Sequence, residues 1–492
     1  MKPSDPLPGA SVALVVEGSP ARLLWARRTD DAPSLRGFHA TPGGLVDPSD
    51  ARLPHDGGEH AEHRVAALRE LFEEAGILRA HGAERLSEDD RASLREALQE
   101  NDRDAVDRFI DAGLRFRTAE LEPIGRWITP EFAPVRYDTR FFALRLDAPI
   151  EPSETILEVE MVEWVDVPDA WGRFEAGELL ITPPLRWLLD GLRSGALDPE
   201  ALRGRFGARA QPAQRWDVVP GVQMLPFRTP TLPPATHTNS YLIGTAEALL
   251  VEPATPYEDE RERMVRWLDE ARGDGIEPIA IFATHHHVDH VGAAGYLRER
   301  LGRPLWAHAM TAERLRGTVV FDRVLEDGEK IALRGAPDVA LRCVHTPGHA
   351  PGHLCLIEER SRVMVCGDMV ASVGTIIVEP TDGDMGLYLD SLRFMKRLAP
   401  SMLLPAHGLP IRDVQGLLDH YIAHRLGREA KVLAALEAHD GPAAPMDLVP
   451  RAYDDAPKAV WPLAAMALEA HLIKLERDGV ARRSTAGWSA LS

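Results

Sequence analysis

The sequence predicts a multidomain protein that combines α/β and α+β architecture. The chain has 492 residues, enough for several domains of about 100–200 residues each. Short β-branched runs alternate with helical patterns and Gly/Pro turns over residues 216–412, as expected for sheet layers covered by helices. A stretch rich in Arg, Gly, Ala and Pro precedes this region. We therefore predict an N-terminal domain over residues 1–190, a linker over 191–215, a central domain over 216–412 and a C-terminal domain over 413–492.

The N-terminal region is predicted to be an α/β unit. Apolar runs between turns indicate strands, and a helical pattern ends near Gly76. A polar, helix-prone insert covers residues 87–111. The predicted strands are residues 11–16, 23–26, 140–146 and 162–165, and the predicted helix is residues 64–75.

Composition argues against disorder and against a membrane-spanning helix. Hydrophobic residues make up 45% of the chain and charged residues 27%, which is ordinary for a globular protein. No apolar run reaches the roughly 18 residues of a membrane helix, and the start of the chain lacks the pattern of a signal peptide. Three cysteines, Cys343, Cys355 and Cys366, are too few for a disulfide framework. We therefore expect a cytoplasmic protein that does not bind a membrane.

The formal net charge is −20, from 56 basic and 76 acidic residues. This surplus of negative charge disfavours a protein covered with phosphate contacts, although a local basic groove is compatible with it.

A group of histidines and aspartates in the central domain carries the strongest functional signal. A buried strand predicted over residues 279–283 leads into His285, His287, Asp289 and His290. Side chains at i and i+2 of an extended loop project to the same side, so His285 and His287 can bind one ion. Asp289 and His290 lie further along and can reach a second ion.

Three later strand ends repeat this arrangement. Strands predicted over residues 339–344, 363–366 and 402–404 are followed by His349, Asp368 and His407. Rigid strand ends can hold such loops against one another. Imidazole and carboxylate ligands together suit zinc, or other borderline ions such as manganese or iron.

This ordered set resembles the metallo-β-lactamase superfamily, whose fold is an αββα sandwich. The superfamily motif His-x-His-x-Asp-His stands at residues 285–290, and Gly-His, Gly-Asp and Ala-His-Gly elements follow it. The resemblance implies two metal ions, with His286 at a variable position. It assigns one ion to His285, His287 and His349, the other to Asp289, His290 and His407, and a bridging position to Asp368. Glu252 and His353 are expected to orient ligands by hydrogen bonds.

Paired metal ions point to a hydrolase. Two ions about 3.5–4 Å apart lower the pKa of a bound water and stabilise charge that develops on the substrate. A metal-bound hydroxide can then attack a phosphodiester, thioester, lactone or amide, with Asp289 as the expected catalytic carboxylate. A di-iron oxidoreductase of the same superfamily is the other interpretation, but the sequence has no flavodoxin-like region to support it.

Further segments resemble the lactamase-β-like-2 endoribonuclease group over about residues 220–485. These are HTNSYLIG at residues 237–244, YIAHR at 421–425, and a tail that resembles a winged helix. Nine basic and nine acidic residues balance each other over 420–492. The predicted helix over 461–477 is apolar, which favours packing, a homodimer contact or a role in shaping the active-site cleft over reading nucleic acid.

A second catalytic pattern lies in the N-terminal domain. Glu70, Glu73 and Glu74 lie three and four residues apart, so they share one face of a helix. Three carboxylates on one face repel one another unless a cation is present, and oxygen ligands suit Mg²⁺ or Mn²⁺. Arg69 is placed to orient one of them. A solvated acidic helix is the alternative on spacing alone.

Residues 69–77, RELFEEAGI, resemble the core of the Nudix box, and residues 37–47 resemble the entry to it. The resemblance implies an α/β/α sandwich with Glu70, Glu73 and Glu74 as catalytic metal ligands. It also implies hydrolysis of a diphosphate linked to another group. Residues 129–130 and 136–142 resemble long-loop members such as coenzyme-A diphosphatases. The interval from Gly44 to Arg69 is longer than usual, and Asp50 stands where the box has its upstream glutamate.

Three hypotheses for the function remain open. The first is a metal-dependent phosphodiesterase or endoribonuclease, acting on single-stranded RNA or a related nucleotide, fused to a Nudix-type diphosphate hydrolase. The alternative is a thioesterase of the acyl-coenzyme A or glyoxalase-II type, or another small-molecule ester or lactone hydrolase. The third is a pseudoenzyme whose tail mediates assembly, which the intact ligand set opposes.

Overall fold

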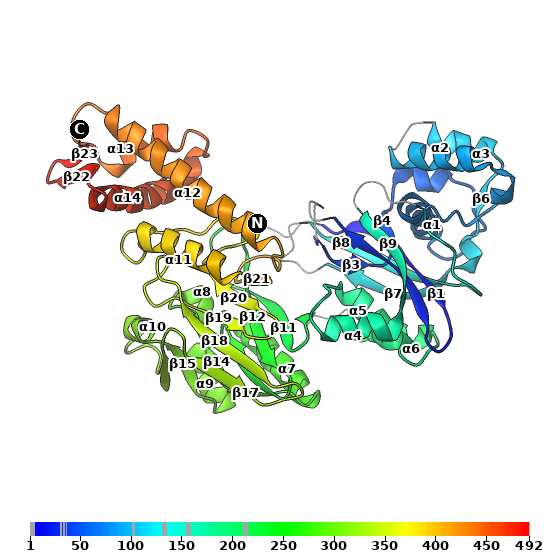
Figure 1. The fold of residues 1–492 in the computed structure, drawn as a ribbon, viewed down its shortest axis with the longest axis horizontal. Helices are drawn as coiled ribbons and strands as arrows, with labels where there is room; N and C mark the ends of the chain where they lie inside the picture. Colours follow the sequence, from blue (N-terminus) through cyan, green and yellow to red (C-terminus); the bar gives the residue numbers. More distant parts are fainter. Residues whose placement is uncertain are drawn as a thin grey trace. The chain divides into compact units, whose positions relative to one another are not determined.

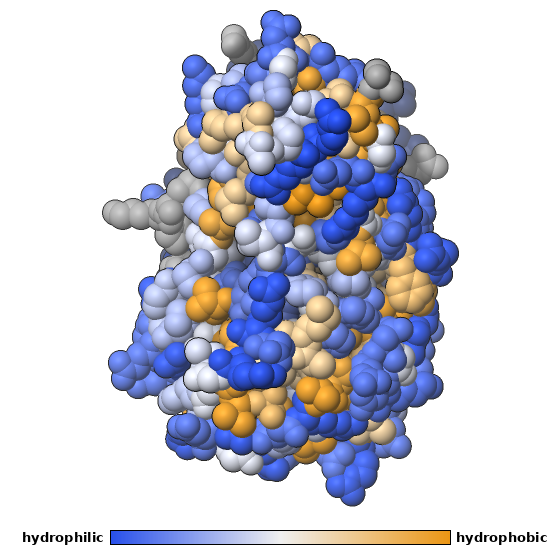
Figure 2. Space-filling model, turned by 90° about the vertical axis from the view of Figure 1, so that its left-hand side faces the viewer, coloured by the Kyte–Doolittle hydropathy of each residue, from blue (hydrophilic) through white to orange (hydrophobic). Residues whose placement is uncertain are grey.

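The computed structural model describes residues 5–29, 32, 35, 37–100, 104–129, 135–153, 159–209 and 215–491. The chain divides into two compact units, one that ends at Pro220 and one that begins at Gly221 (Figure 1). Hydrophobic residues on the face drawn in Figure 2 form small patches separated by hydrophilic ones. None of the helices within the described ranges is long and apolar enough to cross a membrane.

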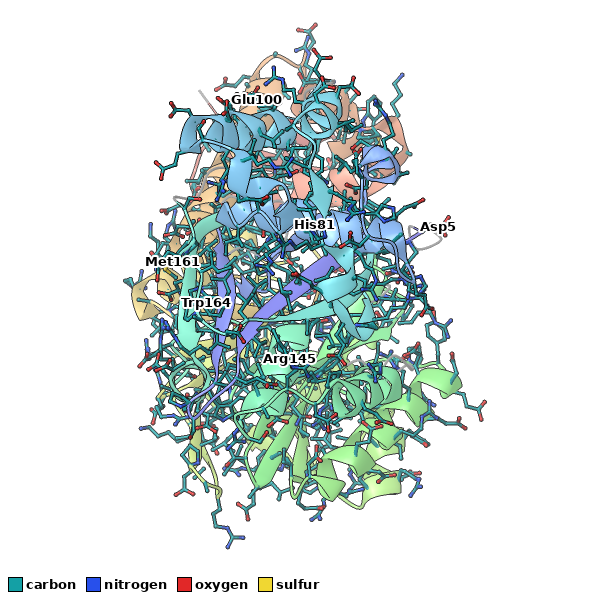
Figure 3. All side chains as sticks on the ribbon, turned by 90° about the vertical axis from the view of Figure 1, so that its right-hand side faces the viewer. Asp5, His81, Glu100, Arg145, Met161 and Trp164 are labelled. Carbon is teal, nitrogen blue, oxygen red and sulfur yellow. The ribbon has the colours of Figure 1, made fainter. Side chains whose placement is uncertain are left out.

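A seven-stranded mixed sheet forms the centre of the first unit. Its main path is β3-β2-β1-β8-β7, with β4 paired to β1 and β9 paired to β2. Figure 3 shows Met161 and Trp164 on β9, and Arg145 at the end of β8. The strands are β1 (Leu7–Val16), β2 (Arg22–Arg28), β3 (His39–Ala40), β4 (Gly43–Leu45), β7 (Glu122–Ile128), β8 (Tyr137–Arg145) and β9 (Val159–Asp166).

Helices cover both faces of this sheet. Side chains alternate along a strand, so Val12 and Leu14 of β1 join a core with α1, whereas Ala13 and Val15 join a core with α4, α5 and α6. The result is an α/β/α sandwich, as the sequence predicts. The helices are α1 (Ala61–Ala75), α4 (Val167–Glu175), α5 (Pro183–Leu192) and α6 (Pro199–Arg209).

The polar insert is helical, as predicted. It forms α2 (Glu88–Gln99) and α3 (Ala105–Asp111), flanked by the short paired strands β5 (Ala80–His81) and β6 (Arg115–Phe116). The Ser87 hydroxyl caps α2 by accepting a hydrogen bond from the Asp90 amide at 3.1 Å. Leu94 and Phe109 anchor the two helices in the core around α1.

The predicted linker over residues 191–215 is wrong for much of its length. Residues 199–209 form α6, and Leu197 and Leu202 are buried in the core that also holds α4 and α5. The composition misled because this segment contributes few large apolar side chains to that core. Residues 210–214 lie outside the described residues. The first unit extends to Pro220, beyond the predicted end at residue 190, and the second begins at Gly221, close to the predicted start at residue 216.

The second unit contains two sheets with helices on their outer faces, the αββα sandwich that the sequence predicts (Figure 1). Helices α7 (Glu258–Gly273) and α9 (Ala294–Leu301) share a core with the first sheet, and α11 (Met385–Leu398) shares one with the second. Short helices α8 (Val288–Val291) and α10 (Ala309–Arg314) follow strand ends.

The two sheets run in simple order. The first pairs β11 (Val222–Arg228), β12 (His237–Gly244), β13 (Glu247–Val251), β14 (Glu277–Phe282), β15 (Leu305–His308) and β16 (Arg323–Leu325). Strand β10 (Trp216–Val219) precedes them in the sequence. The second pairs β17 (Lys330–Leu333), β18 (Val339–His345), β19 (Leu354–Glu358), β20 (Val363–Gly367) and β21 (Met402–Pro405).

The C-terminal tail is built on one long helix, α12 (Val414–Glu437). Leu418 and Tyr421 in its first half lie in the core around α11, and Val432 and Leu436 in its second half lie in the core of the tail. The tail is completed by α13 (Pro445–Ala452), α14 (Trp461–Arg477) and a hairpin of β22 (Ala481–Ser484) and β23 (Gly487–Ala490).

Candidate metal centres

Strand ends of both sheets in the second unit deliver the predicted metal ligands to one place. His285 and His287 follow β14, and Asp289 and His290 lie on α8. His349 follows β18, Asp368 follows β20 and His407 follows β21. The sheets fix the positions of these strand ends. The loops that follow them therefore hold the side chains close to one another.

Three histidines form the first group. His287 Nδ1 lies 3.0 Å from both His285 Nε2 and His349 Nε2, and these last two nitrogens are 3.3 Å apart. Zinc–nitrogen bonds are about 2.0–2.1 Å, so ligands around a tetrahedral ion lie roughly 3.4 Å from one another. The group therefore has the spacing that one ion requires.

Asp289, His290 and His407 form the second group, with ligand atoms within 4.8 Å of one another. Asp368 lies between the groups. Its Oδ2 is 3.6 Å from His349 Nε2, and its Oδ1 is 3.3 Å from His407 Nε2 and 3.5 Å from His290 Nε2. The structure thus gathers all seven predicted ligands and puts Asp368 where a bridging carboxylate is expected.

Hydrogen bonds fix the outward nitrogens of the ligand histidines. His349 Nδ1 lies 2.8 Å from the Ile377 carbonyl, and His407 Nδ1 lies 2.9 Å from the His237 carbonyl. Each contact orients the ring and assigns the proton, which leaves the other nitrogen free for a metal. The buried atoms His290 Nε2 and Asp368 Oδ1 have no hydrogen-bond partner in the described structure. Unsatisfied buried polar atoms at this point fit bound cations.

The two expected supporting residues lie beside the ligands. Glu252 is fully buried after β13, with φ +59°. Its Oε1 accepts a hydrogen bond from the Thr284 hydroxyl at 2.5 Å and lies 3.1 Å from His290 Nδ1. His353 Nε2 accepts a hydrogen bond from the Asp368 amide at 3.1 Å. Each contact helps to orient a candidate metal ligand.

Asp382 lies beside the candidate ligand His287, a contact that the sequence did not indicate. It lies in the loop before α11, and its Oδ2 is 2.9 Å from His287 Nε2 and 3.0 Å from His286 Nε2. Arg314 lies 3.2 Å from its other oxygen. The contact joins residues far apart in the chain, so neither motif nor spacing indicated it.

The pKa values of the histidines shift in opposite directions in the two groups. Burial lowers the pKa of His349 to about 4, against the opposing charge of Asp368. Burial also lowers the pKa of His285 well below its usual value, with a further contribution from His290. In the second group the carboxylates of Asp289 and Glu252 overcome burial and raise the pKa of His290. Neutral imidazoles and ionised carboxylates are the forms that bind a metal.

A pocket of about 230 Å³ opens onto the centre. Five predicted ligands, His287, Asp289, His349, Asp368 and His407, lie in its wall. Most of the remaining wall is apolar or uncharged, from residues 230–235 and 373–377 and from Leu463 and Met466 of α14. Glu379 adds a carboxylate. Among the described residues that line this pocket, none is Lys or Arg.

Two of the three glutamates and Asp50 surround Arg69 in the first unit. The Arg69 guanidinium donates to Glu70 Oε1 at 2.9 Å, to Glu73 Oε1 at 3.0 Å and to Asp50 Oδ1 at 2.7 Å. Glu74 Oε2 accepts from the Gly43 amide at 3.1 Å. Arg69 therefore lies at the centre of this cluster, a more central position than the sequence indicated.

The Gly44 backbone lies close to the Glu70 carboxylate. A Cβ on Gly44 would lie 2.4 Å from Glu70 Oε1. The longer interval before α1 includes the 3-10 helix η1 (Pro48–Arg52), which carries the buried Asp50 into contact with Arg69. Burial raises the pKa of Glu70 to about 7, although Arg69 opposes this. Among the described residues, every group of three ligand atoms within 4.8 Å of one another lies in the second unit. The three glutamates of the first unit do not form such a group.

Family comparisons identify two regions of the second unit. Residues 233–407 match the metallo-beta-lactamase superfamily, and residues 444–488 match the beta-lactamase associated winged helix domain. The beta-lactamase-like protein 2 homolog of Caenorhabditis elegans is 32% identical over 246 residues, which are 49% of this chain and 80% of that protein. The chain therefore belongs to the metallo-beta-lactamase superfamily. It is a hydrolase with His/Asp metal-binding groups and a C-terminal winged helix.

Fungal relatives are matched over a smaller share of their length. The lactamase-like protein nscB of Arthroderma gypseum is 32% identical over 203 residues, 40% of this chain and 59% of that protein. A protein of Aspergillus chevalieri named atrochrysone carboxyl ACP thioesterase is 30% identical over 205 residues, 40% of this chain and 60% of that protein.

Two solved structures each resemble part of the chain. A metallo-beta-lactamase family protein from Thermus thermophilus is 25% identical, with a TM-score of 0.47, and the match covers 56% of this chain and 99% of that one. A NUDIX hydrolase from Alicyclobacillus acidocaldarius is 30% identical, with a TM-score of 0.35, over 40% of this chain and 96% of that one.

Proposed function

We propose that the metal centre of the second unit hydrolyses an ester or thioester whose acyl group is apolar. The wall of its pocket carries this proposal. Beyond the predicted ligands it is almost wholly apolar or uncharged, with Glu379 as its one further charged side chain among those described. Bound metal ions could hold the oxygens at the scissile bond of either substrate, so the wall beyond the ligands distinguishes them. The further phosphates of a nucleic acid strand need cations there, whereas an apolar acyl group needs only apolar surface.

The ligand chemistry supports two divalent ions, for which we propose zinc, with manganese or iron as alternatives. When bound, such ions polarise a carbonyl oxygen and activate water at neutral pH. The chain's own residues fix the site. Glu252, Asp382 and the carbonyls of Ile377 and His237 hold the imidazoles in place, and the apolar wall keeps bulk water from the acyl group.

Asp289 is the carboxylate that we propose for proton transfer. Its side chain is 14% exposed and lines the pocket, and its Oδ2 lies 3.6 Å from His407 Nε2. A carboxylate in this position can take a proton from an attacking water and return it to the leaving alkoxide or thiolate. The thioesterase named among the relatives agrees with this reaction class.

A phosphodiester, such as single-stranded RNA, is the second candidate substrate. The match of residues 444–488 to a winged helix domain favours it, because that fold is used to bind nucleic acids. The charge of −20 and the lack of Lys or Arg among the described residues of the pocket wall weigh against it.

One substrate panel separates the two candidates. The zinc-loaded full chain is offered acyl thioesters, p-nitrophenyl esters, bis-p-nitrophenyl phosphate and single-stranded RNA. We expect ester and thioester hydrolysis that His287→Ala abolishes and Glu73→Gln leaves intact, since Glu73 belongs to the other site. Cleavage of RNA without hydrolysis of any ester would reject the proposal, and so would ester hydrolysis that survives in His287→Ala.

We further propose that the first unit is a Nudix-type hydrolase of a diphosphate joined to another group. Its pocket of about 540 Å³ is lined by Glu70, Glu73, Arg69 and Arg52, which offers both carboxylates for Mg²⁺ or Mn²⁺ and cations for phosphate oxygens. The three glutamates would hold the metal, which neutralises phosphate charge when bound.

This second activity can be tested in the same preparation. Magnesium-dependent cleavage of the P–O–P bond in coenzyme A or nucleoside diphosphate derivatives, followed by chromatography of the two phosphomonoester products, should disappear when Glu73→Ala and Glu74→Ala are combined. The same activity should be unchanged in His287→Ala. Diphosphate hydrolysis that persists in the double variant would contradict this assignment.

A further inference from the structure

Helix α14 of the tail has two apolar faces with different partners. Ala464, Leu468, Leu472 and Leu475 are buried in the core of the tail. Leu463, Met466 and Ala470 follow one another at helical spacing on another face. Ala470 is buried in the core around α11. Leu463 and Met466 are 36% and 39% exposed and line the pocket of the metal centre.

One contact joins α14 to the metal-binding domain and another joins it to α12. Arg477, at the end of the helix, donates a hydrogen bond to Asp384, which caps the start of α11. Lys474 Nζ lies 2.8 Å from Glu429 of α12. The first turns of α14 are therefore held at the pocket by the C-terminal half of the helix, and the position of Leu463 and Met466 is set by the fold.

Another part of the pocket wall is also held in place. Arg425 of α12 donates a hydrogen bond to the Ile376 carbonyl, and the next carbonyl, of Ile377, accepts from the ligand His349 at 2.8 Å. Residues 375–377 thus connect the metal centre to the apolar wall. Leu232, which is 50% exposed, lines the pocket from the loop before β12.

We propose that Leu463 and Met466, together with Leu232, bind the end of the acyl group that lies away from the scissile bond. This inference rests on the proposed ester or thioester hydrolysis and adds what selects the substrate. The tail supplies two of the three side chains, so it sets the acyl length that the metal centre hydrolyses. A charged ligand finds no cation among these side chains, whereas an alkyl chain buries apolar surface against each of them.

The test uses Leu463→Ala combined with Met466→Ala, measured on p-nitrophenyl esters from acetate to decanoate. We expect kcat/KM for the octanoyl and decanoyl esters to fall about tenfold, and kcat/KM for the acetyl ester to change less than about twofold. Leu426→Ala is the matched control, because Leu426 is an apolar residue of α12 with 39% exposure that does not line the pocket. Met466→Leu in place of Met466→Ala should restore most of the lost kcat/KM for the octanoyl and decanoyl esters. An equal loss at every acyl length, or no loss, would overturn the proposal.

A binding measurement keeps the proposal testable if no ester is hydrolysed. Titration calorimetry of the full chain with octanoate should give a Kd that rises about tenfold in the double variant and not in Leu426→Ala. An unchanged Kd for octanoate would overturn the role of α14. Weaker binding of a single-stranded oligonucleotide together with unchanged binding of octanoate would assign these side chains to a nucleic acid instead.

Discussion

His287 Nε2 lies 2.9 Å from Asp382 Oδ2, while His287 Nδ1 faces the other two histidines of the first group. The carboxylate accepts a hydrogen bond from Nε2 and so selects the tautomer in which Nδ1 carries no proton. Nδ1 can then bind a metal. Hydrogen bonds from His286 and His287 overcome burial and hold the pKa of Asp382 well below its usual value. Asp382 is therefore an acceptor at any working pH.

Replacement of Asp382 should weaken metal binding without removing a ligand. We expect Asp382→Asn to lower zinc affinity about 10–100-fold, because the amide no longer enforces the tautomer. Competition with a chromophoric chelator measures this directly. Asp419→Asn is the control, since Asp419 is an exposed carboxylate paired with Lys396. Equal zinc affinities in the two variants would show that Asp382 has no part in positioning His287.

Asp368 should matter to both metal positions. Its two oxygens face different groups, so Asp368→Asn weakens each of them. We expect this variant to retain less zinc after dialysis than either the parent or Asp269→Asn, whose carboxylate lies on the exposed side of α7. Elemental analysis gives the zinc content per chain. Full zinc content in Asp368→Asn would argue against a bridging position.

The acidic cluster of the first unit predicts a pH-dependent stability in metal-free protein. Burial raises the pKa of Glu70 from 4.5 to about 7 in the folded chain. Because the folded value is the higher one, its contribution to stability is complete below about pH 4.5 and is lost as the pH rises through about 7. In chelator, Glu70→Gln should match the parent at about pH 4.5 and be more stable by roughly 1–3 kcal/mol at about pH 8.5.

Chemical unfolding at both pH values measures that difference, with Glu62→Gln on the exposed first turn of α1 as the control. Excess Mg²⁺ at the higher pH should stabilise the parent more than Glu70→Gln, since the ion binds the ionised carboxylate. If the parent is as stable as Glu70→Gln in chelator at the higher pH, the burial of Glu70 carries no penalty and the prediction is wrong.

Arg425 should contribute to stability through its buried contacts. It is 5% exposed, donates to the Ile376 carbonyl and lies 3.4 Å from the Thr375 hydroxyl. Arg425→Ala leaves that carbonyl without its donor, so we expect the free energy of unfolding to fall by about 1–3 kcal/mol. Arg393→Ala on α11, where the arginine pairs with Asp390 at the surface, should cost less than about 0.5 kcal/mol. Thermal and urea unfolding compare the two.

The sequence predicted the central ligands well because local rules place them. Strand ends and the i, i+2 rule indicated the candidate ligands, from His285 to His407, and the resemblance to the superfamily divided them between two ions. The structure gathers these side chains. Asp382 escaped prediction because its loop reaches His287 only through the tertiary fold. The helix α6 was predicted as a linker because it has few large apolar side chains besides the buried Leu202. The central position of Arg69 among the glutamates depends on η1, whose path the sequence did not indicate.

The two halves of helix α12 lie in different cores, the core around α11 and the core of the tail. Its 24 residues span about 36 Å, with Leu418 in one core and Leu436 in the other. Gly427 lies between these halves, and a Cβ there would touch nothing within 4 Å. Glycine inside a helix lowers its stiffness and costs about 1 kcal/mol relative to alanine. The two cores therefore depend on one helix, and Gly427→Ala is expected to stabilise that helix by about 1 kcal/mol without touching the metal centre.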